Sequence, residues 1–221
     1  MGVRLRRSRL DSARTRRLLE HFVAGTTART AAELVGVNRN TATSFYHRLR
    51  KLIAARLARS DDPDATDALM PDEIYLYGTG KLGIKQASST GAPVFGLCLC
   101  RRKIRVMIVP NIQRDTLLQL LNEIHSRGAS VYTVDAILSE ALRSSGMRHH
   151  HIGGHNRFAS TSNHVNRVEN FWNQARRHLH KYNGVPHHHM HLYLKECEWR
   201  FNYGSPGQLL MTLRQWIRED L

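Results

Sequence analysis

The stretch from His164 to Asn183 constrains the fold more than any other part of the chain. It reads HVNRVENFWNQARRHLHKYN, and its apolar residues recur at helical spacing: Val165, Val168, Trp172, Ala175 and Leu179. A polar face runs beside this stripe, with residues three or four apart: Asn166, Glu169, Asn173 and Arg176. The pattern predicts a helix packed on a core, with one carboxylate at the edge of its buried face. From this stretch alone, an ordinary surface glutamate on an amphipathic helix is the favoured interpretation of Glu169.

The charge balance indicates a polyanionic partner. Among 221 residues, 33 Lys and Arg outweigh 18 Asp and Glu, for a net charge of +15. Binding to phosphates releases condensed counterions, so nucleic acid is the leading candidate. No apolar run approaches the roughly 20 residues that span a bilayer, and the N-terminus lacks the apolar core of a secretory signal. The three cysteines do not suggest a disulfide framework. We therefore expect a cytoplasmic protein with no membrane partner.

The N-terminal quarter concentrates the basic charge and has a helical pattern. Residues 1–59 contain 14 Lys and Arg but only three Asp and Glu. Helices are expected at 11–24, 30–35 and 41–57, with Gly25 and Gly36 ending the first two. A short helix, a tight turn and a longer basic helix predict a helix-turn-helix that binds double-stranded DNA. A protein-docking helical bundle is the alternative.

In a helix-turn-helix, the last helix enters the major groove with its first turns. The candidates to contact bases or nearby phosphates are Arg39, Asn40, Thr41, Thr43, Ser44 and His47. The candidates to hold phosphates are Arg48, Arg50 and Lys51. Residues 1–9, which include Arg6 and Arg7, form an arginine-rich arm that either contacts phosphates or a minor groove, or is simply solvated. Arg176, on the later helix, either contacts DNA phosphates or is simply solvated.

A different pattern follows the acidic, proline-containing linker at 60–68. Strands are expected at 69–77, 93–100, 103–109, 130–134 and 148–152, and helices at 113–126, 136–145, 164–183, 187–202 and 206–218. This is the order of an α/β, ribonuclease H-like (RNase H-like) core. In that fold the centre of strand one lies beside the end of strand four, and the helix after strand five packs across them. Asp72, Asp135 and Glu169 occupy those places.

Three converging carboxylates suit phosphodiester chemistry. Two Mg²⁺ ions roughly 4 Å apart can stabilise both the attacking and the leaving oxygen, and hard cations prefer oxygen ligands. The histidine runs at 149–155 and 187–191 lack cysteine or carboxylate partners at familiar zinc spacing. We interpret these histidines as DNA-facing side chains.

Four segments together resemble the DDE transposases of small bacterial insertion sequences, in the group related to Merlin transposons. These segments are GTTARTAAELVGVNRNTATSFYHRLR, PDEIYLYG, HVNRVENFWNQARRHLHKYNGVP and HLYLKECEWRFN. The resemblance implies a helix-turn-helix that binds terminal inverted repeats, and an RNase H-like core that cleaves and joins DNA with Mg²⁺, for which Mn²⁺ can substitute. It also implies a homo-oligomer, at least a dimer on DNA, at the bacterial nucleoid.

Carried onto this sequence, the family motifs assign the first acid to Asp72 and the third to Glu169, with Asn166 as an auxiliary metal ligand. The implied domains are 1–59 (helix-turn-helix), 60–68 (linker), 69–202 (RNase H-like core) and 203–221 (C-terminal helix). Two positions depart from the family pattern. Pro71 precedes Asp72, and Asp135 stands one place later than the family's second acid. A catalytically impaired or domesticated transposase that only binds DNA is therefore the alternative function.

Overall fold

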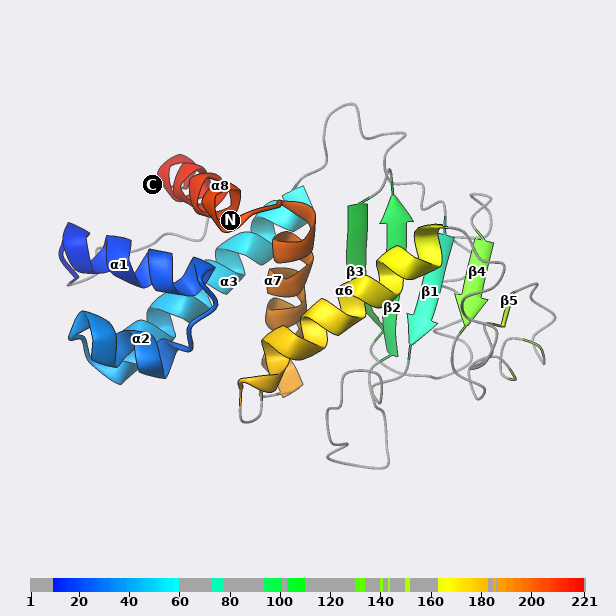
Figure 1. The fold of residues 1–221 in the computed structure, drawn as a ribbon, viewed down its shortest axis with the longest axis horizontal. Coiled ribbons are helices and arrows are strands. Elements are labelled where there is room, and N and C mark those ends of the chain that lie inside the picture. The colour runs from blue at the N-terminus through cyan, green and yellow to red at the C-terminus, as the bar shows by residue number, and fades with distance from the viewer. Residues whose placement is uncertain are drawn as a thin grey trace. The chain divides into compact units, whose positions relative to one another are not determined.

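Two stretches far apart in the sequence form the first unit of the computed structural model (Figure 1). Residues 1–60 and 177–221 make one compact unit, and residues 61–176 make the other. The structure describes residues 10–59, 73–77, 94–100, 103–109, 130–133, 140, 143, 150–151, 163–182, 185 and 187–220. The described residues are mostly helical, with one mixed β-sheet in the second unit.

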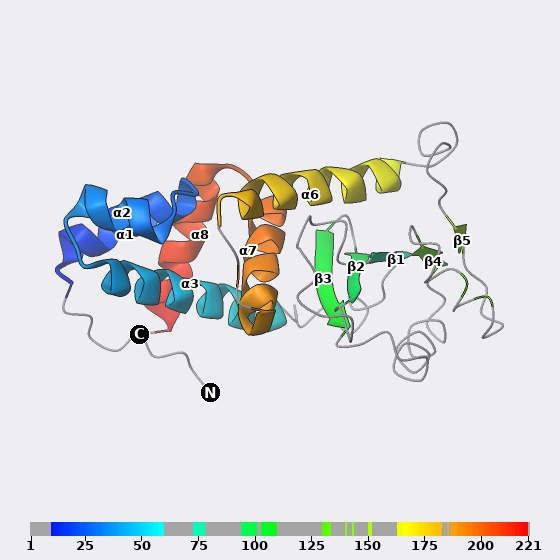
Figure 2. The same cartoon turned by 90° about the horizontal axis from the view of Figure 1, so that it is seen from below.

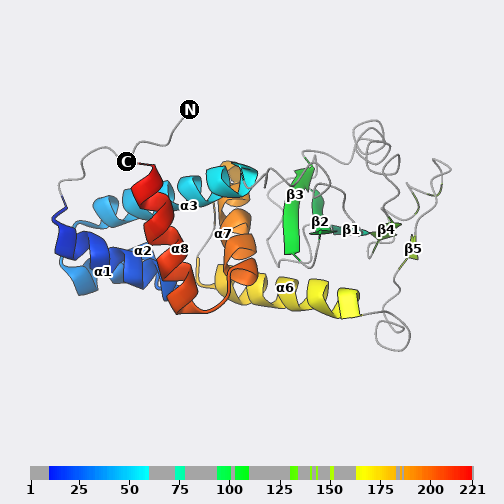
Figure 3. The same cartoon turned by 90° about the horizontal axis from the view of Figure 1, so that it is seen from above.

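The first unit is built from helices contributed by both ends of the chain (Figures 2 and 3). Helix α7 packs against α3, and α8 packs against α1 and α3. The bounds are α1 (Ser12–Val23), α2 (Ala28–Val35), α3 (Arg39–Arg59), the end of α6 (Asn163–His180), the 3₁₀ turn η3 (His187–His189), α7 (Met190–Asn202) and α8 (Pro206–Glu219). The three N-terminal helices expected from the sequence are confirmed within about two residues at most ends.

Local capping explains where these helices begin. The Asp11 side chain accepts a hydrogen bond from the Arg14 backbone N–H at the start of α1. Thr27 does the same for Thr30 in α2. Helix α8 begins with a capping box in which Ser205 and Gln208 satisfy each other's backbone N–H groups. Each cap satisfies a donor that the first helical turn leaves without an intrahelical partner, so these ends are encoded within a few residues.

One hydrophobic core joins the two stretches of the first unit. Its fully buried members include Leu18, Phe22 and Tyr46 from the N-terminal helices and Trp199 and Leu213 from the C-terminal ones. The rings of Phe22 and Trp199 lie 6.2 Å apart between centroids. From the sequence, residues 177–202 are expected in the RNase H-like core and residues 203–221 in a separate helix. In the structure these residues group with the N-terminal helices, because their apolar faces complete this core.

The turn between α2 and α3 depends on Gly36, which adopts φ +72°. A Cβ built there meets nothing within 4 Å, so a substitution would cost only backbone strain. We expect Gly36→Ala to lower the free energy of unfolding by about 1–2 kcal/mol, as measured by urea denaturation. Gly207→Ala is the matched control, because Gly207 lies in α8, where alanine is expected to be neutral or slightly stabilising. Equal effects of the two substitutions would contradict this prediction.

The second unit contains a five-stranded sheet in the order β3-β2-β1-β4-β5. The strands β1 to β3 form an antiparallel meander, and β4 and β5 run parallel to β1. The bounds are β1 (Glu73–Tyr77), β2 (Val94–Cys100), β3 (Lys103–Val109), β4 (Ser130–Thr133) and β5 (His150–His151). All five expected strands are represented among the described residues. Of the expected helices at 113–126 and 136–145, only Glu140 and Arg143 lie within the described residues, and both are helical.

The first part of α6, up to Arg176, belongs to the same unit and lies over one face of the sheet (Figures 1 and 2). Its apolar stripe is buried as expected, with Val168, Trp172 and Ala175 each at most 1% exposed. In β3, Ile104 and Val106 are buried as well, in the alternation of a strand with one face on a core. The stretch that begins at His164 therefore forms the amphipathic helix that its pattern predicts.

Candidate nucleic-acid interface and acidic site

The N-terminal half of α3 presents a polar, basic face to solvent. The Asn38 side-chain oxygen accepts a hydrogen bond of 2.8 Å from the Asn40 backbone N–H just after α3 begins. The residues predicted to contact DNA recur every three or four positions, so they share one face. Of these, Arg39, Asn40, Thr43, Ser44 and Lys51 are exposed, and Thr41, His47 and Arg48 are half-buried. This face has donors and acceptors for base edges near its start and cations for phosphates further along.

Arg50 is an exception, and the prediction that it holds phosphates is wrong. Its side chain is only 4% exposed, and its guanidinium lies 3.9 Å from the centre of the Tyr193 ring. The helical period explains why, because Arg50 follows the buried Tyr46 by four residues and precedes the buried Ile53 by three. The pattern of α3 alone could have placed Arg50 on the buried face.

The partner of Arg50 is Glu196, a buried carboxylate that the sequence analysis did not single out. Glu196 accepts hydrogen bonds from Arg50 Nε at 2.7 Å and from Arg200 Nε at 2.9 Å. His178 Nε2 lies 2.9 Å from Oε1, the same carboxylate oxygen that accepts from Arg200. These contacts join α3, α6 and α7 within the first unit. The i, i+4 spacing of Glu196 and Arg200 in α7 was the available sequence signal.

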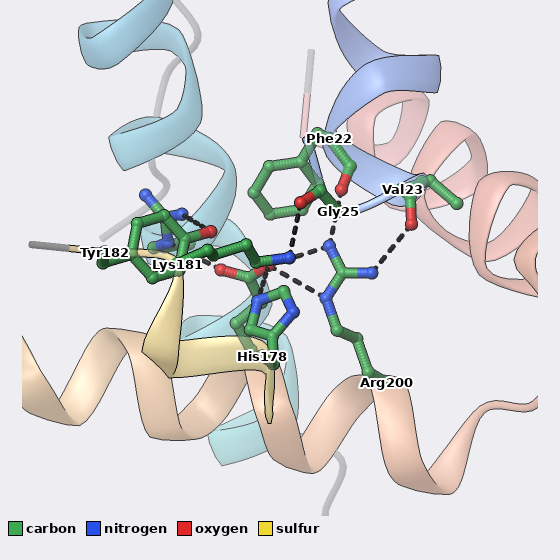
Figure 4. A network of polar contacts seen from close by, with 9 residues as sticks. Phe22, Val23, Gly25, His178, Lys181, Tyr182 and Arg200 are labelled. Atoms are coloured by element: carbon green, nitrogen blue, oxygen red, sulfur yellow. Dashed lines mark hydrogen bonds and ion pairs between the residues drawn. The ribbon is translucent and has the colours of Figure 1, made fainter. Parts of the chain in front are cut away.

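The network continues to the end of α1, where backbone carbonyls need partners (Figure 4). Arg200 donates to the carbonyl of Phe22 at 2.5 Å and to that of Val23 at 2.8 Å. Lys181 donates to the carbonyl of Gly25. The last carbonyls of a helix have no intrahelical donors, so these cations complete the end of α1.

Electrostatics keep the Glu196 carboxylate ionised despite its burial. Burial alone would raise the pKa of Glu196, but Arg200, Arg50 and the hydrogen bond from His178 hold this pKa well below its ordinary value. For His178, burial lowers the pKa more than Glu196 raises it. The imidazole is therefore neutral at pH 7, and its Nε2–H donates to Glu196. These groups form a structural network rather than a reactive site.

Of the predicted acidic residues, Glu169 is the one whose side chain the structure describes. It is half-buried on α6, between the buried Val168 and Phe171 and one turn after Asn166. The side chain of Asn166 lies outside the described part of the chain, as do residues Asp72, Asp135, Arg6 and Arg7. Arg176, on the same helix, is exposed.

The strand register differs from the expected juxtaposition. The first residue of β1, Glu73, pairs with the first residue of β4, Ser130, and the last residue of β4, Thr133, pairs with Leu76. The sequence predicts the end of strand four beside the centre of strand one. Within the residues described, no three His, Cys, Asp or Glu side chains are grouped so that they could hold a metal ion.

Comparisons with known proteins agree with the resemblance seen in the sequence. The family profile of the ISXO2-like transposase domain matches residues 69–202, which is more than half of the chain. The chain belongs to the ISXO2-like transposase family. An uncharacterized transposase-like protein from Haemophilus influenzae is 40% identical over 119 residues, which cover 54% of this chain and 97% of that relative. The resemblance to transposases of bacterial insertion sequences is confirmed.

The ISXO2-like transposase domain contains the whole sheet, α6 and α7, including both Glu169 and Glu196. The helices α1 to α3 precede it in the chain. None of the helices described here is long and apolar enough to cross a membrane. The domain therefore contributes residues both to the sheet unit and to the helical unit.

Proposed function

We propose that this transposase binds the terminal inverted repeats of an insertion sequence through α2 and α3, and cleaves and joins DNA in an RNase H-like core. The main support for the RNase H-like core is the strand order. An antiparallel meander of three strands is followed by two strands parallel to the first, and α6 lies over the sheet (Figure 1). This order is the one expected of an RNase H-like fold, and α6 carries Glu169. Family membership supports the same function.

In this proposal Asp72, Asp135 and Glu169 hold Mg²⁺, with Asn166 as an auxiliary ligand, and Mn²⁺ can substitute. The fit rests on the chemistry of the donors, since all four residues offer oxygen atoms, the ligands that Mg²⁺ prefers. When bound, the ions supply stabilisation of charge on the attacking and leaving oxygens. The chain's own part is to hold its carboxylates in place. Burial of Val168 and Phe171 fixes the turn of α6 that carries Glu169.

DNA binding is assigned to the exposed face of α3, together with the arm that carries Arg6 and Arg7, and Arg176 on α6. We infer that α2, the Gly36 turn and α3 act as a helix-turn-helix, with Arg39 and Asn40 at its entry to the major groove. Two element ends must be brought together, so at least a dimer on DNA is part of the proposal. Such a protein acts on the chromosome, in the bacterial cytoplasm.

We expect Arg39→Ala to weaken binding to duplex DNA and to reduce the slope of log K against log salt by about one. The reason is that the substitution removes one cation that contacts a phosphate or a base edge. Binding is measured by fluorescence anisotropy at several salt concentrations. Arg218→Ala is the matched control, since Arg218 is exposed in the last turn of α8 and not on the α3 face. An identical loss in both variants would argue against the α3 face and for nonspecific attraction.

The alternative is a catalytically impaired transposase that only binds DNA. Two observations favour it: the register that pairs Glu73 with the start of β4, and the displacement of Asp135 from the family position. Incubating the full chain with Mg²⁺ and a plasmid that carries the element's ends separates the two functions. Nicks at the element's ends and joined DNA products support the active transposase. Binding to the ends without cleavage supports the alternative. A failure to bind the ends would overturn both.

A further inference from the structure

The polar face of α3 ends against histidines from the other end of the chain. The rings of His47 and His189 lie 4.6 Å apart between centroids, and those of His188 and His189 lie 4.0 Å apart. Their near neighbour His191 is exposed, like His188. We call His47, His188, His189 and His191 the histidine cluster. All four residues belong to the first unit, so the geometry of the histidine cluster lies within that unit.

Basic groups lie near this cluster. The groups that face His47 are His189 and His188 from the other stretch, and Lys51 and Arg50 from its own helix. The groups that face His189 are His188, His191 and Lys51. Burial and these neighbours lower the pKa of both His47 and His189. The imidazoles of His47 and His189 are therefore largely neutral at pH 7, and a phosphate placed beside them would favour their protonated forms.

The position of the cluster along α3 matches the edge of a groove. His47 follows Arg39 by eight residues, which is about 12 Å along a helix axis. The major groove is also about 12 Å wide, so residues near Arg39 and those near His47 cannot both face the same base pairs. If α3 enters the groove with its first turns, His47 and Lys51 reach the phosphates at its border. This step rests on the proposed DNA-binding function.

We propose that the histidine cluster and Lys51 form a binding site for backbone phosphates of double-stranded DNA, and that this site tightens as pH falls from about 8 to 6. Protonated imidazoles donate charge-assisted hydrogen bonds to phosphate oxygens, whereas neutral ones contribute one weaker donor each. The C-terminal stretch thereby supplies part of the DNA-binding surface, in line with the DNA-facing interpretation of the histidine run at 187–191.

The test uses the full chain and a mixed-sequence DNA duplex of about 30 base pairs, with affinity measured by anisotropy at pH 6 and pH 8 over a range of salt. For the wild-type chain, we expect the slope of log K against log salt to be steeper by about one to two at pH 6, because each added phosphate contact contributes about 0.9. The double variant H188Q/H189Q is expected to lose this difference. The control His180→Gln, at an exposed position at the end of α6, is expected to keep it.

A second variant keeps the test informative if the double variant is unstable. His188→Arg places a permanent cation at an exposed position, so it is expected to bind more tightly than wild type at pH 8. The proposed phosphate site would be overturned if H188Q/H189Q kept the wild-type difference in salt slope between pH 6 and pH 8. It would also be overturned if His188→Arg bound DNA no more tightly than wild type at pH 8. Neither result would contradict the proposed function. If the wild-type chain binds no duplex at either pH, the proposed function itself fails.

Discussion

Replacing Glu196 by alanine is expected to lower the free energy of unfolding by about 3–5 kcal/mol, because it leaves a buried guanidinium group, that of Arg50, and a half-buried one, that of Arg200, without their counter-charge. Arg50 and Arg200 both donate to this carboxylate, which is 1% exposed, and the Arg50 side chain is 4% exposed. Burial leaves little water to replace the lost partner. Urea denaturation of the full chain, followed by tryptophan fluorescence, measures the loss through Trp199 in the same core.

The matched control removes a carboxylate from an exposed ion pair. Glu219 pairs with Arg56 at 2.7 Å, but its side chain is 44% exposed, so Glu219→Ala is expected to cost no more than about 1 kcal/mol. Similar losses for Glu196→Ala and Glu219→Ala would contradict the view that Glu196 holds the two stretches of the first unit together.

Acid should remove the contribution of Glu196. The pKa of Glu196 is depressed in the folded chain, so its stabilisation is fully present above the unfolded pKa, about 4.3. This stabilisation is lost as the pH falls from there through the lower, folded pKa. The difference in unfolding free energy between the wild-type chain and Glu196→Ala should therefore shrink below about pH 4 and not above pH 5.

The second large effect concerns Glu169. We expect Glu169→Ala to slow Mg²⁺-dependent cleavage of the element's ends by at least about 10³-fold, since a metal ligand supports several kcal/mol of transition-state stabilisation. Binding to the same ends should change by no more than about twofold, because DNA recognition is assigned to α3. Cleavage rates are read from end-labelled substrate, and affinity is read from anisotropy.

Asn170→Ala controls for effects on α6 itself. Asn170 is the next residue, is exposed, and accepts a hydrogen bond of 3.3 Å from Gln174 Nε2. This variant should cleave at close to the wild-type rate. If Glu169→Ala cleaves at the wild-type rate, Glu169 is not a metal ligand. If the wild-type chain binds the ends without cutting them, only the DNA-binding alternative remains.

Local signals explain what could be predicted from the sequence. The start of α1 follows from Asp11 and the start of α8 from Ser205, because each cap acts within three residues. The buried stripe of α6 follows from its 3.6-residue period, and the five strands follow from short apolar runs between turn residues. The exposed face of α3 was predictable for the same reason. Family membership came from motifs that are continuous in the sequence.

The tertiary structure decided how these elements combine. The sequence did not indicate that Glu196 pairs with Arg50, because 146 residues separate them. It also did not indicate that the C-terminal helices complete the N-terminal core, or that the ring of His189 lies against that of His47. A helical period shows that a face is buried but not which distant face covers it, since apolar burial is non-directional. Pairing across the chain follows from the whole core, and from the cost of leaving a buried charge without a partner.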